Sequence, residues 1–597
     1  MTSLAAAAGM ARTSLLDSRN RHGLWEGQLA SSSLATATAC MALSLADWKT
    51  HAPALQKGLA WLDTQQNSDG GFGDTDRSRS NLSTSFLVWS LNGRLGRENP
   101  ALGRYIEQLV DTTNPASMAE AVAARYGKDR TFSVPILMMG ALGFRLGALP
   151  SAWKHVPALP FELAAVPRRL FAIVRMPVVS YALPALIAIG RARHVNAPSS
   201  SPFMRLLRRA VRERVLRLLT EIQPTSGGFL EAVPLTAFVT MALVAAGQAD
   251  HPVAQRGIRF LAQSQREDGS WPIDTNLATW NTTLATKALD GRFPNTEQRQ
   301  AVIDWLLNQQ YHVRHPYTDA APGGWAWTDL SGGVPDADDT PGALLALATL
   351  QKSGEEIPAS RLRKSVEAGV RWLLDLQNGD GGIPTFCRGW GNLPFDRSAP
   401  DLTAHTLRAW AAWHDFLPSP LRRRVDAARK RALRYLAASQ QPDGSWLPLW
   451  FGNQYRDDEQ NPTYGTAMVT LALDARDPMA KRGWEWLRQN GNPDGGWGAG
   501  AGSPSSVEET ALAVEALARE GASDALRRGT AWLIRSTDGG RRFRASAIGF
   551  YFARLWYFEE LYPVIWTAGA LRAAHAVLGD ADLGNSMEAP CSATAAG

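Results

Sequence analysis

The chain has 597 residues, of which 45% are hydrophobic and 20% charged, and its formal net charge is +6. This composition is typical of a globular protein too long for one hydrophobic core, so we expect two domains or a large repeat assembly. The mild positive charge suits an anionic membrane surface. Because no basic block is interleaved with aromatic residues, nucleic-acid binding is not expected.

The N-terminal residues 1–20 lack the charged region and long apolar core of a signal peptide, so they are interpreted as a short extension. The three cysteines, Cys40, Cys387 and Cys591, are too far apart in sequence for a disulfide framework or a C-x-x-C metal site, and they favour a reducing compartment. Amphipathic segments rich in small residues then recur and predict helices. These segments are Leu34–Leu45, Pro234–Ala246, Gly342–Leu350, Tyr464–Leu473 and Ser506–Ala518.

A repeated phrase joins these segments. It consists of an aromatic–Leu pair, then Gln, then Asp-Gly followed by Gly or Ser and often an aromatic residue. Copies end around Asp69-Gly70, Asp268-Gly269, Asp380-Gly381, Asp443-Gly444, Asp494-Gly495 and Asp538-Gly539, the last of which is degenerate. Each copy predicts a helix end plus a turn, because Gly tolerates positive φ. Stacked helical hairpins closing into two (α/α) barrel, or toroid, domains follow, in an all-α fold with Gln and Trp as scaffold residues.

The segment 134–220 interrupts the repeats. Its first part is apolar and broken by prolines, and no uncharged run reaches the roughly 20 residues of a spanning helix. In its second part, residues 202–219, Leu and Val alternate with Arg at helical spacing, which is typical of a helix lying in a membrane interface. The alternative is a basic surface helix packed on its own domain.

We therefore expect four segments. Residues 1–20 form the extension, and residues 21–275 form a first barrel domain that includes the membrane-facing segment 134–220. Residues 276–580 form a second barrel domain, whose packing can also recruit N-terminal residues. Residues 581–597 form a disordered tail.

An acidic cluster in the second domain is the candidate catalytic site. Asp336, Asp338 and Asp339 lie within four residues, and Trp325 and Trp327 stand just upstream. Like charges this close raise each other's pKa, so one carboxyl group can stay protonated near neutral pH and act as an acid. Aromatic faces nearby could stabilise a cation made by that acid. Taken alone, such a cluster is more often a solvated loop or a cation site.

Together, the repeats and Asp336-Ala337-Asp338-Asp339-Thr340 resemble class II triterpene cyclases, and bacterial squalene–hopene cyclases in particular. The resemblance runs from Trp25 to Pro563. It implies two (α/α) barrels around a large apolar cavity, with no metal and no organic cofactor. It also implies peripheral, monotopic attachment to one leaflet, on the cytoplasmic face of the cell membrane. A homodimer is left open.

The resemblance also assigns roles to the acidic residues. Asp338 is the proton donor to a terminal alkene, and Asp336 and Asp339 enhance its acidity. Asp401-Leu402-Thr403-Ala404-His405 matches a family segment whose histidine hydrogen-bonds to the acid. Asp401 and His405 are spaced i, i+4, so both can lie on one helix face. A charged His405 would stabilise the carboxylate that remains after proton transfer.

Aromatic residues are expected to contact the substrate and stabilise its cations. The family pattern places there Trp327, Trp280, Phe386, Trp450, Tyr464 and Trp325, together with Tyr551 and Trp556 of an aromatic run from Phe550 to Tyr562. For any one of them, the alternative is core packing. Asn281 replaces the usual Asp, and Phe386 stands where many members have Tyr, so the product and the substrate length stay open.

The expected function is protonation-initiated polycyclisation of squalene, or a closely similar linear polyprene, to a product such as hopene or hopanol. Other substrates are a C35 polyprene, a diterpenyl diphosphate or a prenylated meroterpenoid. An epoxide substrate is disfavoured by Asp338-Asp339. From other classes, the alternatives are a non-catalytic α/α-toroid lipid-binding protein and a prenyltransferase β-like subunit, whose zinc site would need Cys387 near Asp401 and His405.

Overall fold

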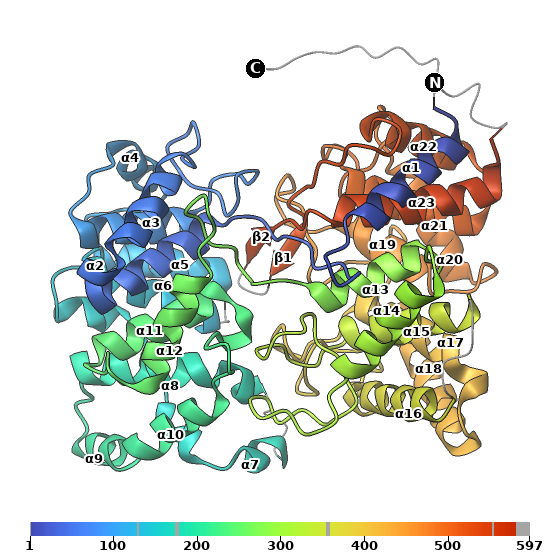
Figure 1. Cartoon of the computed structure of the whole chain (residues 1–597). Helices are drawn as coiled ribbons and strands as arrows, with labels where there is room; N and C mark the ends of the chain where they lie inside the picture. The colour runs from blue at the N-terminus through green and yellow to red at the C-terminus, as the bar shows by residue number, and fades with distance from the viewer. Residues whose placement is uncertain (1, 128–129, 174–177, 354–358, 552–553, 581–597) are drawn as a thin grey trace.

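The computed structural model describes residues 2–127, 130–173, 178–353, 359–551 and 554–580, and these residues are mostly α-helical. Figure 1 shows two groups of helices side by side. The expected all-α toroid architecture is confirmed, whereas the domain boundaries drawn from the sequence stay predictions. The expected disordered tail, residues 581–597, lies outside the described residues.

In the first group, α2, α3, α6, α8 and α11 form an inner ring, because each packs on the next and α11 returns to α2. The helices of this group are α2 (Ser33–Asp63), α3 (Leu82–Leu95), α4 (Pro100–Leu109), α5 (Pro115–Tyr126), α6 (Arg130–Leu142), α7 (Arg168–Ile173), α8 (Val178–Asn196), α9 (Pro202–Ala210), α10 (Arg212–Ile222), α11 (Val233–Ala245) and α12 (Pro252–Gln263).

In the second group, the inner ring consists of α13, α15, α17, α19, α21 and α23, and α23 closes it by packing on α13. The helices of this group are α13 (Ala278–Ala288), α14 (Thr296–Gln309), α15 (Asp339–Lys352), α16 (Ala359–Leu376), α17 (Pro400–Trp413), α18 (Ser419–Ser439), α19 (Pro462–Thr470), α20 (Pro478–Gln489), α21 (Val507–Glu520), α22 (Asp524–Ser536) and α23 (Tyr562–Leu578).

The N-terminal helix α1 (Leu4–Asp17) belongs to this second group, as Figure 1 shows. It packs against α23 and α22 and so completes the outer layer of the second barrel. Leu4, Ala7, Ala11 and Leu15 form its buried face. The chain then crosses to the first barrel, builds it, and returns to the second at α13.

The small-residue segments singled out in the sequence lie in the inner helices α2, α11, α15, α19 and α21. Small side chains allow an inner helix to pack closely on both neighbours and on the outer layer at once. The described residues also include a short antiparallel pair of strands, β1 (Gly549–Tyr551) and β2 (Leu555–Tyr557), in which Phe550 pairs with Trp556.

Hydrogen bonds explain the repeated phrase. The Gln265 amide nitrogen donates to the carbonyl oxygen of Gly269 at 3.0 Å, within its own turn, and to that of Ala54, on a different helix, at 2.8 Å. In the second barrel, Gln377 and Gln440 make the same pair of hydrogen bonds. The repeat Trp271 donates from Nε1 to the carbonyl of Leu261 at 2.7 Å. The expected scaffold role of the repeat Gln and Trp residues is therefore confirmed.

Two further copies of this bonding pattern escaped the sequence analysis. Gln223 donates to Gly227 and Val253, and Gln310 donates to Gly323 and Ser365. Among the described helices, none is both long enough and apolar enough to cross a bilayer.

Candidate active site

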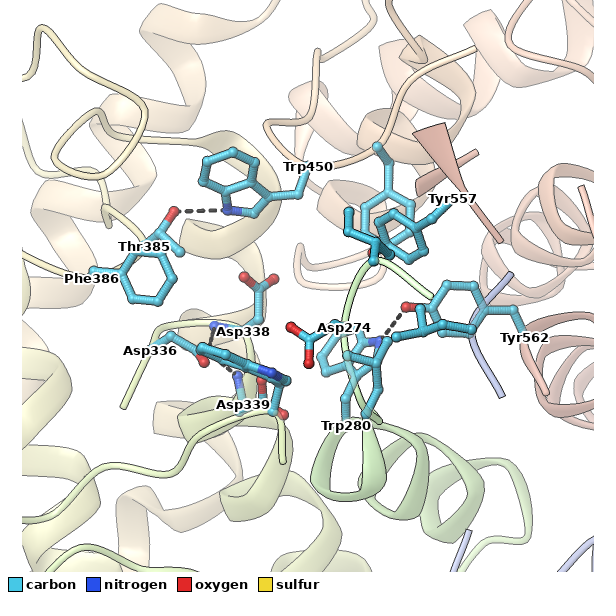
Figure 2. A pocket seen from close by; sticks show the side chains of 15 residues that line it. Asp274, Trp280, Asp336, Asp338, Asp339, Thr385, Phe386, Trp450, Tyr557 and Tyr562 are labelled. Atoms are coloured by element: carbon cyan, nitrogen blue, oxygen red, sulfur yellow. Dashed lines mark hydrogen bonds between the residues drawn. The ribbon is translucent and has the colours of Figure 1, made fainter. Parts of the chain in front are cut away.

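An apolar cavity of about 100 Å³ lies at the N-terminal ends of inner helices of the second barrel, beside the segment that links the two barrels. Figure 2 shows its polar and aromatic side chains. The lining residues are Leu29, Ile273, Asp274, Leu277, Trp280, Trp327, Asp336, Asp338, Asp339, Thr385, Phe386, Trp450, Phe451, Tyr557 and Tyr562.

The acidic cluster enters this cavity where α15 begins. Asp336 Oδ1 accepts the backbone N–H groups of Asp338 at 2.9 Å and of Asp339 at 2.7 Å, so it satisfies N–H groups at the start of the helix. Asp336 and Asp339 are 3% and 2% exposed, whereas Asp338 keeps more accessible surface. The Asp338 carboxyl group makes no capping bond to α15 and points into the cavity (Figure 2).

Burial raises the pKa of all three carboxyl groups. For Asp336, the two N–H donors oppose this effect, so Asp336 is the member that ionises first. Its charge further raises the pKa of Asp338 and Asp339, and Asp401 adds to the effect on Asp338. Asp338 therefore carries a proton near neutral pH. When it gives that proton away, the positive end of the α15 dipole favours the carboxylate that remains.

Asp401 and His405 both lie on α17, one turn apart, behind the cluster. Burial raises the pKa of Asp401 to about 6, and its Oδ2 accepts the Leu449 N–H at 3.4 Å. The His405 ring stands edge-on to Trp280, with the ring centroids 6.0 Å apart. Neither residue lines the cavity directly, so both act on it through their neighbours.

The expected charge on His405 is not what this environment supports. Burial lowers the pKa of His405 well below its usual value, and the nearby Lys287 and Arg408 lower it further. His405 Nε2 lies 3.5 Å from Lys287 Nζ. His405 is therefore neutral, and the cation next to it comes from a residue that the sequence analysis missed.

Lys287 is a partly buried lysine on α13. Burial lowers its pKa to about 7, and Arg408 acts in the same direction, while Glu515 and Asp339 oppose the shift. The Lys287 ammonium in turn lowers the pKa of Asp339. A lysine within the otherwise uncharged, Ala- and Thr-rich segment that forms α13 was the signal in the sequence that could have revealed it.

Of the predicted aromatic residues, Trp280, Trp327, Phe386 and Trp450 line the cavity. Trp280 donates from Nε1 to the Tyr562 hydroxyl at 3.1 Å, and Trp450 donates to Thr385 Oγ1 at 2.8 Å. Both bonds are drawn in Figure 2. Because their N–H groups are held by protein hydroxyls, the orientations of these two indoles are fixed.

The other predicted aromatic residues lie elsewhere. Tyr464 stacks on Phe451 at 3.9 Å and forms a second layer behind the cavity wall. Trp325 is fully buried and donates to the carbonyl of Leu306 at 2.7 Å, so it is a repeat tryptophan of the scaffold instead of a wall residue. Trp556 packs on Phe550, with ring centroids 4.3 Å apart, outside the cavity lining. The side chain of Tyr551 lies outside what the structure describes.

Asn281, at the position where the family usually has Asp, also lies off the cavity. Its amide nitrogen donates to the carbonyl oxygen of Glu26 at 3.1 Å. Asn281 thereby holds the segment that follows α1 against α13. The replacement of the usual Asp by Asn therefore affects this hydrogen bond and not the acidic cluster.

Two neighbouring cavities extend the site. An apolar cavity of about 90 Å³ in the first barrel shares Ile273 with the acid cavity, and Tyr181 of α8 lines it. The Tyr181 hydroxyl donates to the carbonyl of Phe386 at 3.0 Å, so the first barrel helps to fix the acid cavity. A polar cavity of about 320 Å³ shares Trp450 and Phe451 with the acid cavity.

Cys387 does not join Asp401 and His405. Its Sγ lies 3.7 Å from the carbonyl oxygen of Phe395. Within the described ranges, no group of three or more His, Cys, Asp and Glu side chains is arranged to hold a metal ion.

Asp274, Thr385 and Phe451 were missed as wall residues. Asp274 follows the repeat Trp271 by three residues, and a carboxylate in the link between two barrels was the available signal. Thr385 and Phe451 each stand next to a residue that was singled out, Phe386 and Trp450, but neither has a side chain that is distinctive in sequence.

Comparisons with known proteins agree with this geometry. The family profile of the squalene–hopene cyclase C-terminal domain matches residues 227–279 and 276–568, and that of the prenyltransferase alpha-alpha toroid domain matches residues 19–99. A squalene–hopene cyclase of Alicyclobacillus acidocaldarius is 30% identical over 320 residues, 48% of this chain and 46% of that protein. A drimenyl diphosphate synthase of Streptantibioticus cattleyicolor is 30% identical over 324 residues, 49% of this chain and 53% of that protein.

The chain thus spans about half the length of these two relatives, and only 24% of an enfumafungin synthase of Hormonema carpetanum, to which it is 28% identical. The ent-copalyl diphosphate synthase structure from Streptomyces platensis shows the same fold at 18% identity. It has a TM-score of 0.56 and covers 96% of this chain and 99% of that one. The profile match spans more than half of the chain and includes the acidic cluster. The chain belongs to the family of class II terpene cyclases related to squalene–hopene cyclase.

Proposed function

We propose that the protein is a class II terpene cyclase that protonates a terminal alkene of squalene, or of a closely similar linear polyprene, and closes the chain into a polycyclic triterpene. The observation that carries this proposal is the position of Asp338. Its carboxyl group, protonated near neutral pH, faces an apolar cavity walled by fixed aromatic rings.

The proposed reaction starts at Asp338. Its O–H bond breaks, a C–H bond forms at one alkene carbon, and the other alkene carbon becomes a tertiary cation. The carboxylate that remains is next to the N-terminus of α15, whose dipole stabilises it. An alkene is a weak base, so this stabilisation of the ionised acid is needed when the cation forms.

Ring closure then depends on shape and on aromatic faces. A polyprene folded in an apolar mould brings each double bond next to the previous cation, which makes every closure intramolecular. Trp280, Trp327, Phe386 and Trp450 offer ring electrons that stabilise cations without a lone pair that would trap them. Exclusion of water postpones the end of the cascade, which comes by loss of a proton or by capture of water.

The apolar cavity in the first barrel is an argument for a long substrate. It continues the apolar lining into the first barrel, and Ile273 contributes to both walls. A chain whose terminal alkene contacts Asp338 could place its other end in that cavity. Squalene, with no polar group at either end, matches such a pair of apolar spaces.

A specific observation favours a second candidate, an isoprenoid with an anionic head group. The polar cavity next to Trp450 and Phe451 is lined by Arg397 and Arg554, whose charges suit a diphosphate or a carboxylate. Asp458 and Glu459 line the same cavity and oppose such binding.

We also propose that the protein attaches to one leaflet of a membrane, at the cytoplasmic face of the cell membrane. Helix α9 has no buried residue, and its Phe203 and Leu206 are 72% and 68% exposed. Arg208 of α9 pairs with Glu162 at 3.0 Å, and Leu163 beside it and Ile173 of α7 are also exposed. We call Leu163, Ile173, Phe203 and Leu206 the apolar patch. Apolar and basic side chains on one short helix suit an interface with anionic lipid.

The test is to incubate detergent-solubilised protein with squalene, a C35 polyprene, geranylgeranyl diphosphate and a prenylated aromatic acid, each in a separate reaction. Mass spectrometry should identify a cyclised isomer or hydrate of squalene, and Asp338→Asn should give none. A product from the diphosphate alone would favour the second candidate. Binding of all four without conversion would mean a lipid-binding protein and would overturn the cyclase proposal.

A further inference from the structure

Asp274 is a second carboxyl group in the wall of the acid cavity, and the protonation step does not use it. It is 2% exposed and lies in the link between the barrels. Its Oδ1 accepts the Thr275 N–H at 2.7 Å, while Oδ2 has no hydrogen-bond partner among the described residues. Figure 2 shows Asp274 and Asp338 pointing into the same space from different segments.

The surroundings of Asp274 keep it neutral. Burial raises its pKa well above the usual value, and the Glu231 carboxyl group raises it further. The Trp327 indole N–H approaches Asp274 without completing a hydrogen bond. Asp274 therefore carries an O–H group next to the cavity near neutral pH, and no salt bridge among the described residues stabilises its ionised form.

The backbone of Glu231 lies beside the Asp274 segment, and its side chain contacts Ser226 near the surface. Ala232, next to Glu231, pairs with Asp274 in an antiparallel bridge, and the Thr275 hydroxyl donates to the carbonyl of Glu231 at 3.2 Å. Glu231 Oε1 accepts the Ser226 hydroxyl at 2.7 Å, and Ser226 is partly exposed.

Glu231 is itself a buried acid in a strained backbone. It is 1% exposed, and burial raises its pKa, as does the charge of Asp329, while hydrogen bonds from Ser226, the Gly332 N–H and Thr275 oppose the shift. Its φ of 54° and the φ of 56° at Leu230 lie in the left-handed region, which residues other than glycine rarely adopt. The chain is thus held in an unfavourable conformation at the point where the Glu231 side chain meets Ser226.

The proposed reaction creates a demand for protons at Asp338. Each turnover leaves Asp338 as a carboxylate, and the proton lost at the end of the cascade leaves from the far side of the newly formed ring system. Asp338 must therefore regain a proton before the next substrate can react. Asp336 and Asp339 beside it are almost fully buried, so they offer no contact with solvent themselves.

We propose that Glu231 and Asp274 form a relay that returns a proton from solvent at Ser226 to Asp338. This inference rests on the proposed function. Asp274 gives its proton through cavity water to the Asp338 carboxylate, Glu231 then reprotonates Asp274, and solvent reprotonates Glu231 through the Ser226 hydroxyl. In each step one O–H bond breaks and one forms, so the relay ends in its starting state.

The cavity can hold the water that the relay needs. A volume of about 100 Å³ accommodates several water molecules once the product has left, since each needs roughly 10–15 Å³ of such space. The Tyr557 phenol also lines the cavity; burial raises its pKa, a hydrogen bond with Tyr562 opposes the shift, and Asp338, Glu559 and Asp274 add to it.

The decisive experiment compares a single turnover with continuous turnover on squalene in detergent. In Asp274→Asn and Glu231→Gln, the first turnover should be slowed much less than continuous turnover of the same variant, because Asp338 starts out protonated. Continuous turnover should fall about tenfold or more, since reloading becomes slow. The double variant should be no slower than the slower single variant, because both residues belong to one path.

The matched control is Glu508→Gln. Glu508 is also fully buried, with one unpaired oxygen, but it lies at the start of α21 and does not line the cavity. This variant should leave both rates unchanged. If Asp274→Asn slows the first turnover as much as continuous turnover, or slows neither, the relay is overturned.

A measurement without substrate separates the relay from the proposed function. Infrared spectra at neutral pH should show the carbonyl band of un-ionised carboxylic acids, and Asp274→Asn should reduce it by one group. An unchanged band would mean that Asp274 is ionised and holds no proton to transfer, which overturns the relay. Failure of wild-type protein to convert any polyprene would instead overturn the cyclase proposal.

Discussion

Asp338→Asn should abolish cyclisation and leave the fold intact. The Asp338 side chain makes no capping bond to α15, and the backbone N–H at this position would still donate to Asp336 Oδ1. The amide has nearly the same volume as the carboxyl group but has no acidic proton. Turnover should fall by at least the factor of about 10²–10⁴ that a general acid contributes. Product chromatography measures this loss.

The same substitution should also stabilise the protein at high pH. The pKa of Asp338 is raised in the folded state by burial and by Asp336 and Asp401, whereas an unfolded chain has the ordinary value. Above about pH 4 the unfolded state therefore ionises first, and the wild type loses about 1.4 kcal/mol of stability for each pKa unit of elevation, until the pH passes the folded value. Asn does not titrate, so the variant avoids this loss.

Urea unfolding at about pH 4 and about pH 8 measures the effect. The two proteins should have similar free energies of unfolding at the lower pH, and the variant should be the more stable at the higher pH. A variant that still cyclises, or that is less stable than the wild type at pH 8, would refute the assignment of Asp338 as a buried, protonated acid.

Three further predictions concern the surroundings of the acid and the surface. Lys287→Met should lower turnover and remove a step from the pH profile of activity. Wild-type activity should fall as pH rises through about 7, where the Lys287 ammonium loses its charge. Identical pH profiles of wild type and variant would show that the charge of Lys287 does not support turnover. Trp325→Ala should lower the free energy of unfolding by about 3–5 kcal/mol, because it leaves a cavity at a fully buried scaffold position. Trp280→Leu should mainly change the turnover rate or the products. Denaturant midpoints measure the first effect, and product analysis measures the second. Phe203→Glu combined with Leu206→Glu should release the protein from anionic vesicles in a sedimentation assay, since each side chain contributes about 1.5–3 kcal/mol when buried in lipid, and unchanged activity in detergent is the control.

The fold was largely predictable because its signals are local. Small-residue segments predicted five of the inner helices, α2, α11, α15, α19 and α21, and the repeated Gln and Asp-Gly predicted the turns between helices. The copy at Gln310 was missed because 13 residues separate this Gln from Gly323, whereas four separate Gln265 from Gly269. The hydrogen bond requires only that the two residues are close in space. The loop between Gln310 and Gly323 brings them together although their separation in sequence differs from that of the other copies.

The site was predictable only where a motif marked it. The acidic cluster and Trp280 were identified, since both stand in recognisable segments. The charge of His405 was predicted wrongly because it depends on Lys287, which another helix supplies. Asp274 acquires a meaning only when the cavity is known, because a single carboxylate after a repeat is ordinary in sequence.

The position of α1 constrains how the molecule can form during synthesis. Its apolar face, Leu4, Ala7, Ala11 and Leu15, finds its partner only when α23 has been made, more than 500 residues later. The first barrel contains none of this helix and can fold while the ribosome is still translating the second. Until then the α1 face stays exposed to water, where it is a site for chaperone binding or for wrong pairing. Helix α23, which is made late, therefore buries α1, which is made early.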